Sequence, residues 1–255
     1  MVITDETTDR LRRRASAGDA HASTELARLL SLTASEGTEP ESEEPTWPEE
    51  SWLRAAVTAR PDDVTALTLL TGRLAQQTAY WQDILDMNPN ILEAYGEDTS
   101  SIRRRRTETA ELYARLRRFD LPEHTRAGLD ELGALLGVRD DTAMEDPYSY
   151  YTLEDEAWGG SVCHFARIVT SDADALRWAC DRWLVHSEGG LGELTLTTRV
   201  AGAEPSLVRL DEHVSGRTVD WSSVTLPELT GTPLPAGLPV PGQHGLYYGF
   251  SAGAE

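Results

Sequence analysis

The chain has 255 residues and a formal net charge of −20, from 43 acidic and 23 basic side chains. Its hydrophobic fraction of 40% and charged fraction of 26% are typical of a soluble globular protein, so it can bury one large core or two modest ones. So acidic a surface repels nucleic-acid phosphates and anionic membranes, and it favours basic protein partners or serves solubility alone.

The chain contains no lysine, and all 23 of its basic residues are arginine. This excludes a P-loop lysine, a Schiff-base lysine and the lysine–glutamate pair of protein kinases. Residues 1–15 contain no apolar segment of a secretory signal, and no run of about 18 apolar residues occurs. Two cysteines, Cys163 and Cys180, are too few for a disulfide framework. These features predict a cytoplasmic protein that does not cross a membrane.

The first predicted helices contain small residues at close spacing. The stretch "ASAGDAHASTELARLL" carries, in order, Gly18, Ala22, Leu26, Ala27 and Leu30. Glycine and alanine let two helices approach closely, so this segment predicts a tight helix pair.

The stretch that follows, residues 33–50, contains seven glutamates, three prolines and no basic residue. Because it is too polar to bury, it predicts a disordered or extended acidic loop. Trp47 stands in this loop between Pro45 and Pro48. Its side chain could dock on the protein's own surface or on a partner, and the sequence leaves both open.

Two predicted helices meet at Pro61, whose ring ends the first of them. Asp62 and Asp63 then supply a cap and favourable charge for the next N-terminus. The apolar residues of the second helix recur at helical spacing on one face: Leu67, Leu70 and Leu74. The same helix-then-proline ending recurs at Pro89 and at Pro122.

Together these patterns resemble degenerate tetratricopeptide repeats, whose units are helix pairs of about 34 residues, and the segment around Gly18 is similar to their Sel-like variant. Pro89 and Pro122 stand 33 residues apart, close to that period. The segment "GLDELGALLG" has the large–large–small–large order of a first repeat helix: Leu129, Leu132, Gly133 and Leu136. The resemblance implies that residues 1–138 form an all-α helical-repeat domain with a groove for a protein or peptide.

The pattern changes after a second acidic stretch, residues 139–160, which we interpret as an interdomain connection. Residues 161–255 contain several strand-like segments: "SVCHFARIVT", "ELTLTTRV", "SLVRLDEH", "RTVDW" and "LYYGFSA". One helix interrupts them. We therefore predict a two-domain α+β protein, with a helical-repeat domain followed by a small α+β domain that has a mostly antiparallel sheet and one main helix.

That helix is predicted in "SDADALRWACDRWLVHSEGG". Ser171 can cap its N-terminus, and Asp172 and Asp174 add favourable charge to its first turn. The apolar residues lie on one stripe: Leu176, Ala179, Cys180, Trp183 and Leu184. The predicted solvent side consists of Arg177, Asp181 and Arg182.

The residue types that carry chemistry form no recognisable active site. Six histidines are scattered, and no local ligand pair of the zinc-site type occurs. Cys163 and His164 are neighbours on a predicted strand, so they point to opposite faces and cannot readily form a thiolate–imidazole pair. Helix capping accounts for Asp172 and Asp174 without a metal ion. We predict no catalytic residue, no metal and no cofactor.

Four consecutive arginines, Arg103 to Arg106, stand in this acidic chain. They could form a solvated helix face that pairs with the protein's own carboxylates. The repeat resemblance implies a second interpretation, in which Arg103 and Arg104 line the groove and their planar guanidinium groups bind a peptide carboxylate. Because successive helix residues turn by about 100°, Arg105 and Arg106 then point elsewhere.

These features favour a non-enzymatic cytoplasmic interaction protein, of an immunity or adaptor type. Its partner would be a protein or peptide that is basic or has an exposed carboxylate, and Arg103, Arg104 and Trp47 are the predicted contact residues. The alternative is an enzyme with its site in the C-terminal domain. The residues that could face such a cleft are His164, Glu193, Arg199 and Asp211.

Overall fold

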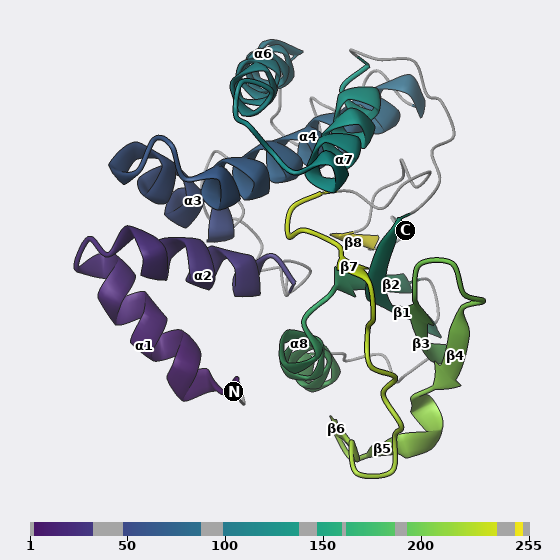
Figure 1. The fold of residues 1–255 in the computed structure, drawn as a ribbon. Helices are drawn as coiled ribbons and strands as arrows, with labels where there is room; N and C mark the ends of the chain where they lie inside the picture. The colour runs from purple at the N-terminus through teal and green to yellow at the C-terminus, as the bar shows by residue number, and fades with distance from the viewer. Residues whose placement is uncertain are drawn as a thin grey trace.

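The computed structural model describes residues 3–32, 48–87, 99–137, 147–159, 162–186, 193–238 and 248–251. In these ranges, helices fill the N-terminal half and a largely antiparallel sheet fills the C-terminal half, with one long helix, α8 (Ala173–His186), beside the sheet (Figure 1). The predicted mixture of an N-terminal helical half and a C-terminal antiparallel sheet is confirmed. None of the described helices combines the length and the apolar content that a membrane span requires.

The helices described in the N-terminal half are α1 (Asp5–Ser16), α2 (Ala20–Leu30), α3 (Pro48–Ala59), α4 (Val64–Met87), α6 (Thr99–Leu116) and α7 (Glu123–Leu135). The Thr4 hydroxyl caps α1 by accepting a hydrogen bond from the Thr7 amide at 3.3 Å. The Asp19 carboxylate caps α2 by accepting from the Ala22 amide at 3.1 Å. Gly18 lies between the two helices with a φ of +89°, a conformation that favours glycine. Local sequence therefore sets these helix ends.

The turn between α3 and α4 follows the sequence prediction. α3 ends at Ala59, just before Pro61. Asp63 caps α4, because its carboxylate accepts a hydrogen bond from the Ala66 amide at 3.1 Å. The prediction that this acidic pair starts a helix is confirmed for Asp63, whereas Asp62 lies exposed one position earlier.

α4 is the central helix of this half, and every residue from 66 to 75 is buried. α3 and α6 pack against it, and α2 and α7 also contact it. Part of the C-terminal half approaches as well, because a Cβ atom on Gly72 would overlap the main-chain carbonyl oxygen of Gly237. A helix enclosed in this way carries its polar residues into the core, where they need partners.

The main sheet is built from β1 (Tyr148–Gly159), β2 (Val162–Thr170), β3 (Glu193–Arg199), β4 (Ser206–Arg209), β7 (Thr232–Pro233) and β8 (Tyr248–Ser251). Its strand order is β4-β3-β1-β2-β8 with antiparallel neighbours, and β7 pairs in parallel with β1. A short 3₁₀ turn, η1 (Asp211–His213), precedes a separate hairpin of β5 (Val214–Ser215) and β6 (Thr218–Val219). β1 is therefore the central strand.

This central strand lies inside residues 139–160, the stretch that the sequence analysis interpreted as an acidic connection. β1 pairs with β2 on one side and with β3 on the other, so that Leu153 lies opposite both Ile168 and Leu196. Side chains alternate between the two faces of a strand. The tyrosines and the leucine of β1 are therefore buried on both faces of the strand. Their burial makes this segment a strand, although its acidic content predicts an exposed connection.

α8 packs against one face of this sheet (Figure 1). The predicted apolar stripe is buried as a whole: Leu176, Ala179, Cys180, Trp183 and Leu184. The predicted solvent side needs one correction. Asp181 is half-buried, its carboxylate accepts a hydrogen bond from the Val219 amide at 3.4 Å, and burial raises its pKa. Arg177 and Arg182 are partly exposed and lie over tryptophan rings.

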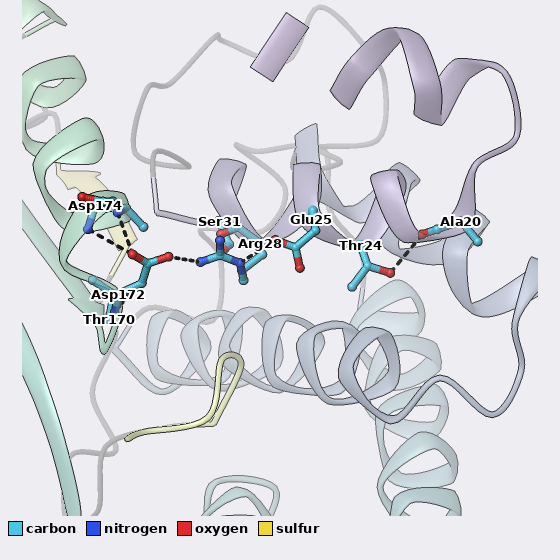
Figure 2. A network of polar contacts seen from close by, with 9 residues as sticks. Ala20, Thr24, Glu25, Arg28, Ser31, Thr170, Asp172 and Asp174 are labelled. Atoms are coloured by element: carbon cyan, nitrogen blue, oxygen red, sulfur yellow. Dashed lines mark hydrogen bonds and ion pairs between the residues drawn. The ribbon is translucent and has the colours of Figure 1, made fainter. Parts of the chain in front are cut away.

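The N-terminus of α8 is capped by Asp172 and not by Ser171 as predicted. Asp172 Oδ1 accepts hydrogen bonds from the amides of Asp174 and Ala175 at 3.0 and 3.1 Å (Figure 2). The Ser171 hydroxyl instead donates to the carbonyl oxygen of Leu234 at 2.9 Å. Both residues are good caps by local rules, and a distant segment decides between them.

The two halves contact each other through apolar and charged side chains. Leu29 of α2 and Leu32 just after it belong to the hydrophobic cluster between α8 and the sheet. Arg28 of α2 places Nη1 3.2 Å from Oδ2 of Asp172, the second oxygen of the α8 cap (Figure 2). The division into two domains at residues 139–160 stays a prediction.

Candidate functional site

The arginine run lies on α6, at the edge of the molecule opposite α1 and α8 in the view of Figure 1. α6 packs against α4 through a narrow face on which Ile102, Thr109 and Leu116 are buried. These residues are seven positions apart, close to two helical turns, so they share one side of the helix. The other sides of α6 carry its polar and charged residues.

The four arginines separate into two pairs around this helix. Arg103 and Arg104 are exposed, and the described residues give neither side chain an ion pair or hydrogen bond. Arg105 is half-buried near Glu108, whose pKa it helps to lower. Arg106 donates to a main-chain carbonyl just after α7 at 3.5 Å. The turn of about 100° per residue explains why neighbours in the run have different surroundings.

Glu108 of α6 is held by Arg54 of α3. Two nitrogens of the Arg54 guanidinium donate to the two oxygens of Glu108, with Nη2 to Oε2 at 2.9 Å. Arg54 Nε also donates to Glu50 Oε1, on its own helix, at 2.7 Å. The hydrogen bonds that Arg54 donates to Glu108 lower the pKa of Glu108. The hydrogen bonds that Arg54 donates, first to Glu108 and next to Glu50, also raise the pKa of Arg54 itself. Arg54 therefore joins α3 to α6 by a bidentate, charge-assisted contact.

The acidic residues beneath Arg54 are buried, contrary to the prediction of an exposed loop over residues 33–50. Residues 33–47 lie outside the described ranges, but α3 already begins at Pro48. Glu49 is 0% exposed and Glu50 is 5% exposed. Composition predicts exposure because an isolated carboxylate is unstable in a protein core. Arg73 beside Glu49 and Arg54 beside Glu50 offset part of the cost of burying these two, and so does the N-terminal end of α3.

The charge of Glu49 is balanced by Arg73 of the central helix α4. Arg73 Nε lies 2.7 Å from Glu49 Oε1, and Arg73 is 5% exposed. The contact is an attraction between charges and not an aligned hydrogen bond, because neither oxygen of Glu49 has a hydrogen-bond partner in the described part of the chain. Burial raises the pKa of Glu49, against the opposing attraction of Arg73. Gln77, one turn farther along α4, is also buried, and its amide group makes no hydrogen bond to the described residues.

The exposed and the buried charged groups of this region have different chemical capacities. The outer guanidinium groups of Arg103 and Arg104 can each donate two parallel hydrogen bonds to a carboxylate or a phosphate. The inner pair of Glu49 and Arg73 is closed to solvent, so it can fix α3 against α4 but cannot reach a substrate.

In the C-terminal half, Glu193 and Asp211 converge on Arg209, a residue that the sequence analysis did not single out. Arg209 Nη1 lies 3.4 Å from Glu193 Oε1, and Arg209 Nη2 lies 2.8 Å from Asp211 Oδ2. The hydrogen bonds from Arg209 lower the pKa of Asp211, so this carboxylate stays ionised at neutral pH and is a poor proton donor. Arg199 is half-buried, and the side chain of His164 lies outside the described part.

Trp47 lies outside the described ranges, so its predicted docking role stays a prediction. Cys180 is buried in the hydrophobic cluster between α8 and the sheet, which agrees with its predicted place in the core. The part of the chain that the structure describes contains no group of three or more histidine, cysteine or acidic side chains placed to hold a metal ion.

Arg54 and Glu108 are not among the residues predicted from the sequence. The four-residue spacing from Glu50 to Arg54 is a readable signal for a pair on one helix face. Glu108 stands 54 positions from Arg54, and no local pattern connects the two. Comparison with protein-family models, curated proteins and solved structures finds no match to this chain.

Proposed function

We propose that this chain is a non-enzymatic protein-interaction module that binds a carboxylate-bearing segment of a protein partner on the Arg103–Arg104 face of α6. One observation carries the proposal: both guanidinium groups are exposed and have no ion pair among the described residues. The chain has 43 acidic side chains, so a pair of cations that the described residues leave without an ion pair is available to a carboxylate from outside.

The chemistry of arginine supports a carboxylate as the group recognised. The planar guanidinium matches the two oxygens of a carboxylate, and its weak hydration makes it easier to bury in an interface than a lysine ammonium. Such a contact gains strength when the partner excludes water from it. Arg103 and Arg104 are exposed, so a partner can reach both guanidinium groups and exclude water from them.

The net charge of −20 gives this recognition an unusual salt dependence. An acidic partner is repelled by the whole protein at long range and attracted by Arg103 and Arg104 at short range. Salt screens the long-range repulsion most, since the Debye length is about 8 Å at physiological ionic strength. Moderate salt should therefore raise the association rate, whereas an ordinary pair of oppositely charged proteins associates more slowly.

The proposal includes a helical-repeat architecture for the N-terminal half. α1 packs on α2, α2 on α3 and α3 on α4, which is the succession that stacked helix pairs require. Degenerate tetratricopeptide-like units would place the arginine face of α6 on a surface that binds an extended peptide.

The proposal is tested with a fluorescently labelled oligoglutamate peptide that has a free C-terminal carboxylate. Combining Arg103→Ala with Arg104→Ala should weaken binding by about 2–5 kcal/mol, through faster dissociation, if the complex desolvates the pair. The matched control combines Arg10→Ala with Arg13→Ala. Both are exposed on α1, have no ion pair within the described ranges and carry the same charge. Equal losses from the two double variants would refute the α6 site and leave only bulk charge.

A further inference from the structure

Arg104 has one acidic residue within a helical turn of α6, and that residue is Glu108, four positions later. Residues four apart on a helix are neighbours, and opposite charges there attract each other weakly. Arg103 has no acidic residue three or four positions away in either direction. Glu108 is therefore the carboxylate of α6 that could neutralise the proposed binding face from within.

Arg54 prevents this by occupying Glu108 from another helix. Both carboxylate oxygens of Glu108 accept hydrogen bonds from the Arg54 guanidinium, and the side chain of Glu108 is 37% exposed. Arg54 is itself fixed by Glu50, whose side chain is only 6% exposed. A bidentate charge-assisted contact is stronger than a solvent-exposed pair within one helix, so Glu108 stays with Arg54.

We infer that Arg54 is a positioning residue for the Arg103–Arg104 face, because it holds Glu108 away from Arg104 and so keeps that face cationic for an acidic partner. The inference rests on the proposed function of this face. It assigns to the contact between α3 and α6 a role in recognition in addition to its role in stability. Two carboxylates, Glu50 and Glu108, share the single guanidinium of Arg54, and their negative charge is kept off the face.

Arg105 is the second cation that Glu108 can reach, since it is three positions away and already lowers the pKa of that carboxyl. Removing Arg54 therefore gives the released carboxylate two choices on α6. Pairing with Arg104 neutralises the binding face, whereas pairing with Arg105 leaves the face unchanged. The experiment has to separate these two outcomes.

The test uses Arg54→Gln, which removes the charge but keeps a donor for Glu50, so that the buried carboxylate retains a hydrogen bond. Binding of the oligoglutamate peptide at low salt should weaken about two-fold, as expected from an exposed pair four residues apart. Adding Glu108→Gln should restore binding, because the competing carboxylate is gone. Adding Glu111→Gln instead is the matched control, since Glu111 is exposed on α6 and has no ion pair in the described residues. Restoration by Glu111→Gln as well would show that only net charge matters, and would overturn the inference.

A second measurement decides the inference without any ligand. In ¹⁵N-labelled protein, the Arg104 Nε–H resonance should shift on Arg54→Gln and return on adding Glu108→Gln. A shift at Arg105 alone, or no shift at either residue, would overturn the inference even if the peptide binds. Failure of the parent protein to bind the peptide would instead count against the proposed function, while the Arg104 resonance would still report where Glu108 goes.

Discussion

Replacing Glu49 with glutamine removes a buried charge while it keeps the shape of the side chain. Glu49 is 0% exposed, neither of its oxygens has a hydrogen-bond partner among the described residues, and the charged groups that act on it are Arg73 of α4 and Glu50 of α3. We expect Glu49→Gln to be more stable than the parent protein at neutral pH. The physical reason is that burial penalises the charged carboxylate by more than Arg73 attracts it.

Folding and the protonation of Glu49 are linked. Burial raises the pKa of Glu49 in the folded protein above its ordinary value of 4.5, so the folded state holds this proton more tightly than the unfolded state does. The stability that this group contributes is fully present below pH 4.5 and is lost as the pH rises through the folded-state pKa. In that window the loss reaches about 1.4 kcal/mol for each pH unit. Glutamine does not titrate, so the difference in the free energy of unfolding between the variant and the parent protein grows with pH and then becomes constant.

The measurement is urea denaturation of both proteins, followed by circular dichroism from pH 4 to pH 8. Glu111→Gln is the matched control, because it removes the same charge from an exposed site on α6 and should leave the pH dependence unchanged. Breaking a productive buried ion pair instead destabilises a protein by about 3–5 kcal/mol. A loss of that size for Glu49→Gln at neutral pH would mean that the attraction of Arg73 exceeds the penalty of burial, and the reasoning would be wrong.

Three further substitutions and one control variant test the packing. Gly72→Ala should destabilise by about 1–3 kcal/mol in chemical denaturation, because its Cβ would overlap the carbonyl oxygen of Gly237; an unchanged midpoint would mean that the two segments do not touch. Trp183→Ala should destabilise by about 3–5 kcal/mol, and a change below about 1 kcal/mol would show that α8 packs by another face. Asp172→Ala should cost about 0.5–2 kcal/mol, because it removes the cap of α8. Arg28→Ala, which removes only the partly exposed ion pair, should cost less than about 1 kcal/mol, so equal losses would contradict the cap assignment.

The sequence by itself determined several boundaries of the secondary structure. Pro61 and Asp63 mark the junction of α3 and α4, because proline cannot continue a helix and an aspartate side chain satisfies the first free amides of the next one. The apolar stripe of α8 was readable because helical periodicity reports a buried face directly. The spacing of apolar residues also changes from helical to alternating along the chain, and this change predicted a helical half followed by a sheet half.

The candidate site was only partly readable. The exposure of Arg103 and Arg104 is compatible with what their charge predicts, but the division of the run depends on what each arginine contacts in the folded chain. Arg105 lies close enough to Glu108 to help lower its pKa, and Arg106 donates to a main-chain carbonyl after α7. Helical geometry shows that the four arginines diverge, and only the fold shows what each one meets.

Tertiary structure alone decided the burial of charge and the choice between equal local signals. Glu49 reads as part of an exposed acidic loop, yet it lies in the core because Arg73 comes to it from the next helix. Ser171 and Asp172 are equally good caps, and Ser171 is not the cap because its hydroxyl donates to the carbonyl oxygen of Leu234. In each case the deciding partner lies many residues away in the chain. Local patterns record propensity and periodicity, and the electrostatic and hydrogen-bond partners that override them exist only once the chain has folded.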